Sequence, residues 1–478
     1  MAPNYGFYST CLYYSINYTI FTSGINCPRK MKKLPLALLF LVSTLQAQDL
    51  DFTGMVNLQG IMSSESESPF WFHSNKRGRI DEKTSFAGWA NGAATYNFNP
   101  EAFLEVGAGA LYQNGYTDKV QADEYYLTFQ YDWFSATVGR KQRSELYQGL
   151  SATNENMLWS INSRPMPGIR FTTTRPVMLW KAAGVGFKAT LEEYLMDDER
   201  HIEDARVHHK SLHLVFNKIR NTEISFGIRH FAQWAGTSEE FGKLPGGFDD
   251  YLRVVTGKGI GGNAEDGVSE QEINGLGNHL GSYEIQLKTS FRNYNIELLW
   301  NHIFEDGSGS RLRNTPDGRY GVYFSDTRED RMVDALMYEF YFTKDQSKGS
   351  STTDGTDNYF NNNLYRSGWT YESRVLGVPF FTLNENRFRI GNNRFIVHHL
   401  GLTGNLSENL PYKLLASYRK NYGGKGAGYA ETQNVFSSYI DVKVWQAYVD
   451  FNVQVGADFA SNASPNYGMG LLLSKNLF

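Results

Sequence analysis

The sequence predicts an all-β fold, a transmembrane antiparallel β-barrel. Three observations support this prediction. Segments of alternating apolar and polar residues recur along the chain, short turns alternate with long connections, and aromatic residues make up 15 % of a sequence that contains 46 glycines. Glycine and aromatic residues suit twisted sheets and the aromatic belts of membrane interfaces better than helical bundles.

The alternation is clearest in five segments: Leu104–Tyr112, Tyr125–Trp133, Tyr283–Phe291, Tyr294–Trp300 and Trp445–Val455. Such runs reach about 9–11 residues, enough to cross a bilayer at a tilt, whereas strands of soluble sandwiches have about five or six. Strand length therefore favours a membrane barrel over a soluble sandwich. Weaker segments of the same kind lie near residues 85–98, 134–140, 182–194, 206–219, 222–233, 332–343, 365–375, 394–405, 410–420 and 467–478. We expect about sixteen to eighteen strands, and an even number is typical.

The connections between these segments are of two kinds. The short turns are Asn97–Pro100, Lys218–Thr222 and Arg292–Asn293. The long connections are Gly236–Gly281, Glu305–Gly321, Lys344–Asn363 and Gly377–Asn393. Short turns on one side and long loops on the other are typical of outer-membrane barrels, whose short turns face the periplasm.

Residues 31–47 have the organisation of a secretory signal peptide. The basic pair Lys32–Lys33 precedes the apolar segment Leu34–Leu45, and cleavage is expected near Ala47. Export combined with a membrane barrel predicts a location in the bacterial cell outer membrane.

We interpret residues 1–30, which lie upstream of the signal peptide, as a gene-model N-terminal extension; the alternative is a genuine leader. Cys11 and Cys27, the two cysteines of the chain, fall in this segment. The mature chain would then have no disulfide, thiol nucleophile or cysteine-ligated metal. We expect residues 48–478 to form the barrel, with a plug or helical insert near 143–166.

The start of the mature chain, Gln48–Asp81, has no clear alternation, and we expect it along the barrel interior or at the periplasmic mouth. No stretch of the mature chain reaches the roughly 18 apolar residues of a membrane helix. The net charge of −4 does not suggest a nucleic-acid partner.

The stretch Gly139–Arg175 has neither strand alternation nor a helical stripe. Its charges are mostly basic, it carries Trp159 and several asparagines, and Pro165 and Pro167 end any regular element near Arg164. Two interpretations stay open. The stretch is either a functional insert or an ordered plug or periplasmic turn whose arginines pair with carboxylates.

Motifs for catalysis or metal binding are weak. Gly257–Gly262 matches G-x-G-x-x-G, but without a strand before it and a helix after it we interpret it as a glycine-rich loop. The pairs His208–His209 and His398–His399 point to opposite faces of a strand, so neither can chelate one ion from one surface. Asp354–Asn358 lacks the spaced ligands of an EF-hand loop. We therefore predict no catalytic residue, no metal ligand and no cofactor.

Several motifs resemble the capsule assembly Wzi family of outer-membrane proteins, in the form found in Bacteroidetes. They are Phe70–Asn75 with Gly78–Arg79, Gly139–Gln142, Gly149–Asn156, Arg164–Arg170, Gly277–Gly281, Asn392–Arg394 and His398–Gly401. The resemblance implies an 18-stranded outer-membrane β-barrel with a small periplasmic helical element. It also implies a non-enzymatic, lectin-like role, in which the barrel binds and anchors capsular or exopolysaccharide at the cell surface.

A polysaccharide site needs aromatic platforms beside amides and arginines, which stack on sugar faces and hydrogen-bond hydroxyl or acidic groups. By chemistry and motif position, the candidate polysaccharide-binding residues are Arg140, Tyr147, Asn154, Trp159, Arg164, Arg170, Asn278, His279, Asn393 and Arg394. The expected partners are capsular or exopolysaccharide, outer-membrane lipid and the barrel-insertion machinery. We expect a monomer.

Two other functions are compatible with the same sequence. An outer-membrane porin or selective diffusion channel has the same fold with an open lumen, whereas the Gly139–Arg175 insert favours a plugged barrel. An outer-membrane enzyme acting on lipid or glycan requires a nucleophile or a carboxylate dyad, and the sequence shows no motif for either.

Overall fold

The structure, a computed structural model, describes residues 49–258, 276–305, 309–328, 331–348 and 357–478. The chain divides into two compact units, Met1–Asp49 and Leu50–Phe478, and every helix and strand given below belongs to the second.

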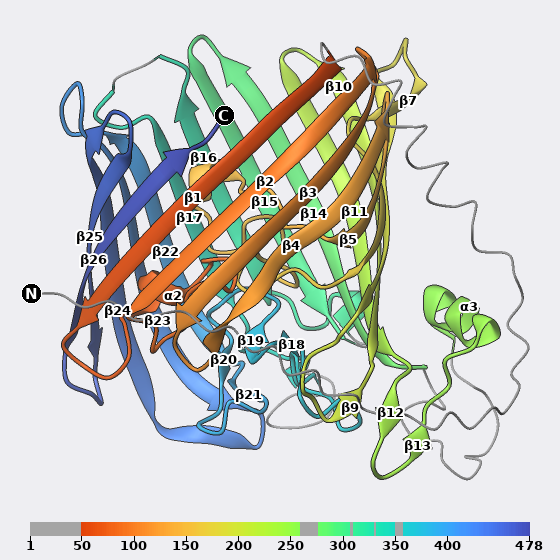
Figure 1. The fold of residues 1–478 in the computed structure, drawn as a ribbon. Coiled ribbons are helices and arrows are strands. Elements are labelled where there is room, and N and C mark those ends of the chain that lie inside the picture. Colours follow the sequence, from red (N-terminus) through yellow and green to blue (C-terminus); the bar gives the residue numbers. More distant parts are fainter. Residues whose placement is uncertain (1–48, 259–275, 306–308, 329–330, 349–356) are drawn as a thin grey trace, which may run out of the picture. The chain divides into compact units, whose positions relative to one another are not determined.

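The second unit is a closed antiparallel β-barrel, as predicted (Figure 1). The strands of its wall are β1 (Leu50–Ser63), β2 (Phe86–Asn99), β3 (Ala102–Asn114), β4 (Asp118–Tyr131), β5 (Phe134–Arg140), β6 (Gly168–Thr173), β7 (Val177–Trp180), β8 (Val185–Leu195), β10 (Arg206–Ile219), β11 (Thr222–Trp234), β14 (Asn278–Phe291), β15 (Tyr294–Phe304), β16 (Gly318–Asp326), β17 (Ala335–Phe342), β22 (Phe395–Asn405), β23 (Pro411–Gly424), β24 (Ala427–Gln446), β25 (Asp450–Ala460) and β26 (Asn466–Asn476). β6 and β7 both pair with β8 and act as one strand, so the wall has 18 strands. β1 pairs with β2 and with β26, which closes the barrel.

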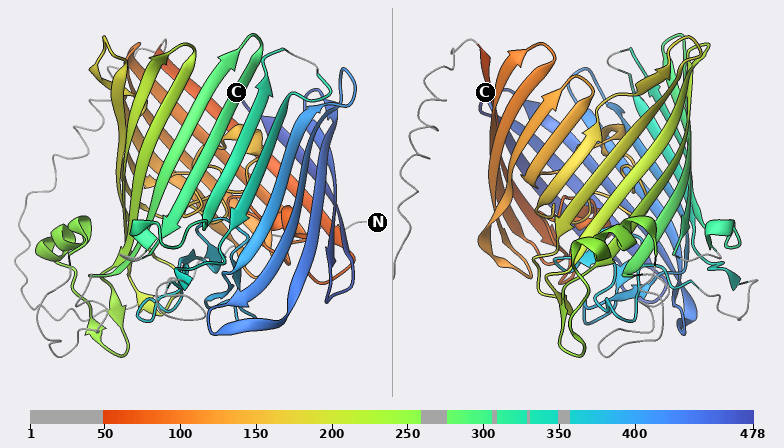
Figure 2. Two further views of the ribbon diagram at one scale, coloured as in Figure 1. Left: turned by 180° about the vertical axis from the view of Figure 1, so that it is seen from behind. Right: turned by 90° about the vertical axis from the view of Figure 1, so that its right-hand side faces the viewer.

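Strand β4 shows why the wall is apolar on the outside. Tyr125, Leu127 and Phe129 are exposed, whereas Glu124 and Thr128, at the alternate positions, are buried on the lumen side. Successive side chains of a strand point to opposite faces, so alternation in the sequence becomes an apolar exterior and a polar interior. The tilt of the strands, visible from two further sides in Figure 2, is what closing a sheet into a barrel requires.

The two ends of the barrel differ. Two-residue turns join β4 to β5, β10 to β11 and β14 to β15 at one end, which we call the short-turn end. The other end, the long-connection end, carries residues 64–85, 141–167, 235–277 and 343–394. In outer-membrane barrels the short turns face the periplasm and the long connections face the outside.

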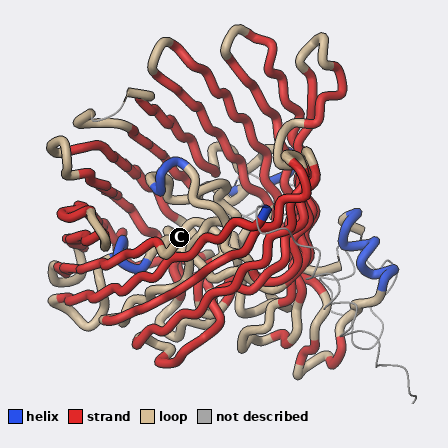
Figure 3. The backbone as a smooth tube through the Cα atoms, turned by 45° about the horizontal axis from the view of Figure 1, so that its top comes forward, coloured by secondary structure: helices blue, strands red, loops and turns tan. Residues whose placement is uncertain are grey.

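The described residues of three long connections, 64–85, 141–167 and 343–348 with 357–394, pack together inside the barrel and form what we call the plug (Figure 3). Its elements are α2 (Phe70–His73), η2 (Tyr147–Gly149), β18 (Thr370–Tyr371), β19 (Arg374–Val375), β20 (Thr382–Leu383) and β21 (Ile390–Asn392). Trp159 meets Trp369 at 6.0 Å between ring centroids, and Asn162 donates to the Val375 carbonyl at 3.1 Å. The insert therefore leaves the wall at the end of β5 and fills the lumen.

Other short elements lie in the remaining connections. They are β9 (Ile202–Glu203), β12 (Thr237–Ser238), β13 (Gly242–Lys243), α3 (Phe248–Thr256) and η3 (Gly309–Arg311). Within the described ranges, no helix is long and apolar enough to span a membrane. Of the α-helices in the described residues, α2 lies in the plug and α3 lies beside the long-connection end.

Some predictions for individual segments are wrong. Trp445–Val455 is not one strand, because β24 ends at Gln446 and β25 begins at Asp450. Residues 365–375 belong to the plug, where β18 and β19 pair with each other. The segment Leu50–Ser63, which we expected along the interior or at the periplasmic mouth, is the first wall strand.

Several sequence predictions concern residues outside the described ranges. They are the N-terminal extension 1–30, the signal peptide 31–47, Cys11, Cys27, most of the glycine motif Gly257–Gly262 and part of Asp354–Asn358.

Candidate functional site

The plug is attached to the wall around most of the barrel. Polar contacts reach strands from β4 to β25. They are Arg79–Asp123 on β4, Arg143–Glu192 on β8, Glu155–Arg229 on β11, Asn156–Ser282 on β14, Thr153–Arg319 on β16, Ser151–Glu339 on β17, the Leu150 carbonyl with His399 on β22, Glu145–Lys413 on β23, Lys76–Tyr439 on β24 and the Phe70 amide with Asp458 on β25. Because these contacts point in many directions, the plug cannot move without breaking several of them.

One group of buried contacts centres on Glu339, which is fully buried. Its carboxylate accepts hydrogen bonds from Ser151 Oγ at 2.7 Å, from the Ala152 amide at 2.8 Å and from Tyr341 Oη at 2.8 Å, and pairs with Arg319 at 3.3 Å. A buried charge is stable only when such partners replace its water. Glu339 therefore fixes the middle of residues 141–167 against β17.

Glycines let α2 approach the wall closely. A Cβ atom at Gly468 would lie 2.9 Å from Phe72, one at Gly470 2.8 Å and one at Gly456 3.0 Å. Contacts this short would force the Phe72 ring or the strand to shift, so glycine at these positions leaves room for the ring against β25 and β26.

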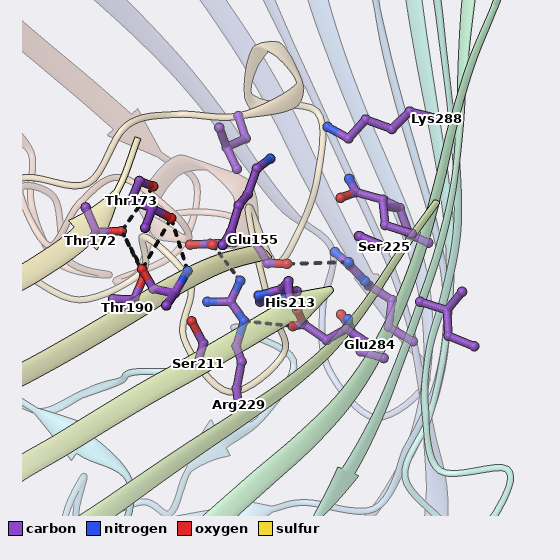
Figure 4. Close-up of a pocket in the computed structure, with 18 of the residues that line it drawn as sticks. Glu155, Thr172, Thr173, Thr190, Ser211, His213, Ser225, Arg229, Glu284 and Lys288 are labelled. Atoms are coloured by element: carbon purple, nitrogen blue, oxygen red, sulfur yellow. Dashed lines mark hydrogen bonds and ion pairs between the residues drawn. The ribbon is translucent and has the colours of Figure 1, made fainter. Parts of the chain in front are cut away.

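An inner cavity of about 280 Å³ lies on the short-turn side of the plug (Figure 4). Arg229 stands at its centre and pairs with Glu155 at 2.6 Å and with Glu284 at 2.9 Å. His213 contacts Glu284 at 2.5 Å. The Arg229 guanidinium lowers the pKa of Glu155 to about 2, against the effect of burial. The carboxylates that face this cavity are therefore already paired with cations from the wall.

An outer cavity of about 540 Å³ opens at the long-connection end. It lies between the β3–β4 hairpin, the β8–β10 connection and the plug. Its acidic residues are Asp81, Asp197, Asp198, Glu199 and Glu372, and its basic residues are Lys119, Arg374 and Arg387. The amides Gln113, Gln121 and Asn386 and the ring of Tyr116 also line it, together with Gly78, Thr117 and Ser373.

Two buried arginines hold the acidic floor of the outer cavity. Arg164 pairs with Glu372 at 2.9 Å, and Arg140 pairs with Asp197 at 2.9 Å and approaches Glu372 at 3.6 Å. Burial raises the pKa of Glu372, although both arginines act in the opposite direction. The two carboxylates are thus fixed in position while part of each still faces the cavity.

Tyr116 forms the aromatic side of the outer cavity. Its ring lies 4.0 Å from the Arg387 guanidinium and 4.7 Å from Lys83 Nζ, and its hydroxyl donates to Glu67 at 3.0 Å. Arg387 also pairs with Glu82 at 3.0 Å. Burial raises the pKa of Glu82, but the nearby cations outweigh it and bring the pKa to about 2. Tyr116 is therefore held in place while its outer part stays exposed.

The outer cavity combines carboxylates, amides, cations and an aromatic ring. Carboxylates and amides accept or donate hydrogen bonds to hydroxyl groups, arginine and lysine pair with acidic groups, and aromatic rings stack on apolar faces. A polar ligand with many hydroxyl groups suits this set of groups. The outer cavity lies at the end of the barrel that such a ligand can reach from outside the cell.

The residues selected from the sequence do not form one cluster. Arg140 and Arg164 lie under the outer cavity, and Tyr147 and Arg170 line the inner cavity. Trp159 belongs to the aromatic core of the plug, 5.5 Å from Phe231.

The other candidates have mainly internal partners. Asn154 accepts from the Leu146 amide at 2.6 Å, Asn278 donates to Gln233 at 3.0 Å, and Asn393 donates to the Tyr359 carbonyl at 3.0 Å. The Arg394 amide donates to the Gly423 carbonyl at 3.1 Å, and His279 lies on the outer face, 2.8 Å from His230.

The members of each histidine pair point to opposite faces, as predicted. His209 stacks on Phe231 in the lumen at 4.1 Å, whereas His208 faces outward toward Glu193. Likewise His399 contacts Ser417 inside and His398 contacts Tyr338 outside. Among the described residues there is no group of three or more His, Cys, Asp or Glu side chains that could hold a metal ion.

Sequence reasoning missed Tyr116, Lys119, Asn386 and Arg387 of the outer cavity. They lie at the β3–β4 hairpin and in residues 343–394, where no alternation or motif marks them. The basic and amide-rich composition of the long connections was the only sequence signal for a polar site. Composition does not identify which individual residues form that site.

A closed wall with an apolar exterior, unequal ends and a packed lumen defines a plugged β-barrel of the outer-membrane type. The model of the capsule assembly protein Wzi family matches residues 73–467, and the chain belongs to this family. It is therefore a protein of the bacterial outer membrane.

The solved structure of a family member shows the same fold, and a solved outer-membrane channel is a weaker match. Wzi of Escherichia coli, described as an outer-membrane protein involved in group 1 capsule assembly and as a carbohydrate-binding β-barrel, is 13 % identical with a TM-score of 0.55, over 94 % of this chain and 89 % of that one. OccK3 (OpdO) of Pseudomonas aeruginosa is 11 % identical with a TM-score of 0.48, over 92 % and 99 %. No curated protein matches the chain.

Proposed function

We propose that this barrel binds capsular or exopolysaccharide at the cell surface and anchors it there, without catalysis. The observation that carries the proposal is the outer cavity, a polar site with a fixed acidic floor and an exposed tyrosine at the outward-facing end. Membership of a capsule assembly family and the carbohydrate binding described for Escherichia coli Wzi support it.

The geometry favours retention of a ligand over its passage. Behind the outer cavity, Arg140 and Arg164 are tied to the plug, and the plug is tied to the wall by the contacts described above. A glycan segment held against Tyr116, Asn386 and Lys119 would thus rest on a rigid base. A porin would need this material to be displaced.

The remaining expectations belong to the same proposal. The signal peptide at residues 31–47 directs export, with cleavage near Ala47, and the barrel-insertion machinery places the chain in the membrane as a monomer surrounded by outer-membrane lipid. The candidate residues Tyr147 and Arg170 of the inner cavity offer a second, periplasm-facing contact for a glycan.

The first experiment compares cell-bound and released polysaccharide in a deletion strain and in strains complemented with wild type, Tyr116→Ala or Tyr429→Ala. Tyr116 and Tyr429 are both 44 % exposed at the long-connection end, but only Tyr116 lines the outer cavity. We expect the deletion and Tyr116→Ala to shed polysaccharide into the medium and Tyr429→Ala to retain it.

The outcomes separate the competing functions. Equal retention in all strains would refute anchoring and favour the channel, which single-channel conductance in planar bilayers then tests. A second outcome is that the deletion strain loses cell-bound polysaccharide while Tyr116→Ala and Lys119→Ala retain all of it. That result would support anchoring but show that the outer cavity is not the binding site.

A further inference from the structure

One patch on the outer wall is polar where a barrel should be apolar. On β10, His208 and Lys210 share the outward face with Leu212, which is exposed. His230 on β11 and His279 on β14 face the same way and contact each other at 2.8 Å. Side chains with hydrogen-bonding groups are costly against lipid unless another part of the protein satisfies them.

Helix α3 covers this patch. Tyr251 packs edge-on against His208 at 5.5 Å and at a tilt against Trp234 at 5.6 Å, and Val254 is fully buried. Lys210 Nζ donates to the Val255 carbonyl near the helix C-terminus. Figures 1 and 3 show α3 outside the ring of strands, beside the wall. The helix is therefore fixed to the lipid-facing side of the barrel.

The ends of α3 are defined by its own sequence. The Asp250 carboxylate accepts the Gly247 amide at 2.9 Å, and Gly257 adopts the left-handed conformation with a φ of 67°. Such caps satisfy backbone groups that a helix leaves unpaired. The helix is therefore fully formed, and its exposed side chains belong to regular structure.

A second apolar face of α3 has no cover among the described residues. Phe248 is 73 % exposed and Leu252 is 46 % exposed, and at a spacing of four residues they share one side of the helix. Asp249 and Arg253 each follow one of these residues and lie about 100° further round the helix, on an adjacent, charged side. Near the helix, Arg206 lies over the Trp234 ring at 5.2 Å. Amphipathic helices with aromatic and basic residues of this kind lie in the membrane interface.

We infer that α3 is an interfacial helix embedded in the outer leaflet of the outer membrane, with Phe248 and Leu252 in the lipid. The occupant of its uncovered face is lipid, because that face continues the apolar exterior formed by Leu212 and Ile228 on the neighbouring strands. The leaflet is the outer one, because α3 belongs to a connection at the long-connection end. The inference rests on the membrane barrel alone and is independent of polysaccharide binding.

The test uses site-specific fluorescence. Cys11 and Cys27 are the two native cysteines, so the full chain with Cys11→Ser and Cys27→Ser accepts a single label. Phe248→Cys and Asp249→Cys are labelled with an environment-sensitive fluorophore and reconstituted in phosphatidylcholine vesicles that carry nitroxides on their acyl chains. Both positions are exposed at the same end of the helix, so they differ mainly in the direction in which their side chains leave the helix.

We expect a blue-shifted emission at position 248 that the nitroxides quench several-fold more strongly than at position 249. Equal quenching at the two positions, whether strong or absent, would overturn the inference. Each labelled protein is first checked for the heat-dependent gel mobility of a folded barrel, and Lys243→Cys on β13 provides a water-exposed reference.

Discussion

Ser151 of the plug donates a hydrogen bond to Glu339 of β17 at 2.7 Å, and this contact joins two residues that are both buried. The same carboxylate also accepts the next backbone amide and pairs with Arg319. The plug is thereby connected to the wall through a charge that has no access to water.

Replacing Glu339 by Gln is expected to loosen the plug. The substitution leaves Arg319 as an unpaired buried cation, and breaking a buried ion pair costs about 3–5 kcal/mol. We expect a lower unfolding temperature in detergent and channel openings in planar bilayers that wild type lacks. Glu408→Gln in the exposed β22–β23 turn is the matched control. A Glu339→Gln protein with wild-type stability and conductance would show that the contact does not hold the plug.

Acid is expected to weaken the plug through Glu155. Its pKa in the folded protein is about 2, below the ordinary 4.5, because of Arg229 and Arg143. A lowered carboxyl pKa stabilises the folded state above about pH 4.5, and the contribution is lost as the pH falls from about 4.5 toward about 2.

The check is the unfolding temperature as a function of pH for wild type and Glu155→Gln. We expect the wild-type protein to have the higher unfolding temperature. The difference from Glu155→Gln should be constant above pH 5 and should shrink as the pH falls from about 4.5 toward about 2. An advantage that does not change with pH would mean that the charge of Glu155 contributes nothing.

A methyl group at Gly468 is expected to displace α2. The added Cβ would lie 2.9 Å from Phe72 and 2.7 Å from Pro69, and overpacking of this kind costs about 1–3 kcal/mol. Gly60→Ala is the control, because a Cβ there meets no atom within 4 Å. We expect a lower unfolding temperature for Gly468→Ala than for Gly60→Ala. Adding Phe72→Leu to Gly468→Ala should recover part of the lost stability. Equal stability of the two alanine variants would contradict the close packing of α2.

Arg164→Ala and Trp159→Ala are expected to lower polysaccharide retention while the barrel still assembles. Arg164 holds Glu372 in the floor of the outer cavity, and Trp159 packs the plug against Phe231 of β11. Arg175→Ala, an exposed position in the same stretch, is the control. The measurement is cell-bound against released polysaccharide, with outer-membrane levels of each variant quantified. If both variants retain polysaccharide as wild type does, the role of the insert is purely structural.

The wall was predictable because burial on one side leaves a period of two in the sequence, as in Tyr125–Tyr131. The same regularity caused the error at Trp445–Val455, since the turn at residues 447–449 preserves the alternation across two strands. Strand β24 was missed because its first half, around Glu431, is polar on both faces and exposed. Alternation in the sequence therefore marks the part of a strand that contacts lipid. It does not mark the part of a strand that extends beyond the membrane.

The plug and the outer cavity were less predictable for a different reason. The plug buries aromatic residues such as Phe380 in irregular chain, which has no period to detect. In the outer cavity, Tyr116 and Arg387 come from distant parts of the sequence and meet only because the β17–β22 connection folds back into the barrel. Candidate residues chosen by type from Gly139–Arg175 therefore included several whose partners are internal.

The position of α2 links the start of the chain to its end. α2 follows the first strand, yet Phe72 packs against glycines of β25 and β26, and the Phe70 amide donates to Asp458. Synthesis delivers this segment long before the hairpin that it contacts. The strands that complete the wall at the seam between β1 and β26 are therefore also the strands that hold Phe72. Closure of the barrel and docking of α2 depend on the same hairpin, so neither is complete without the other.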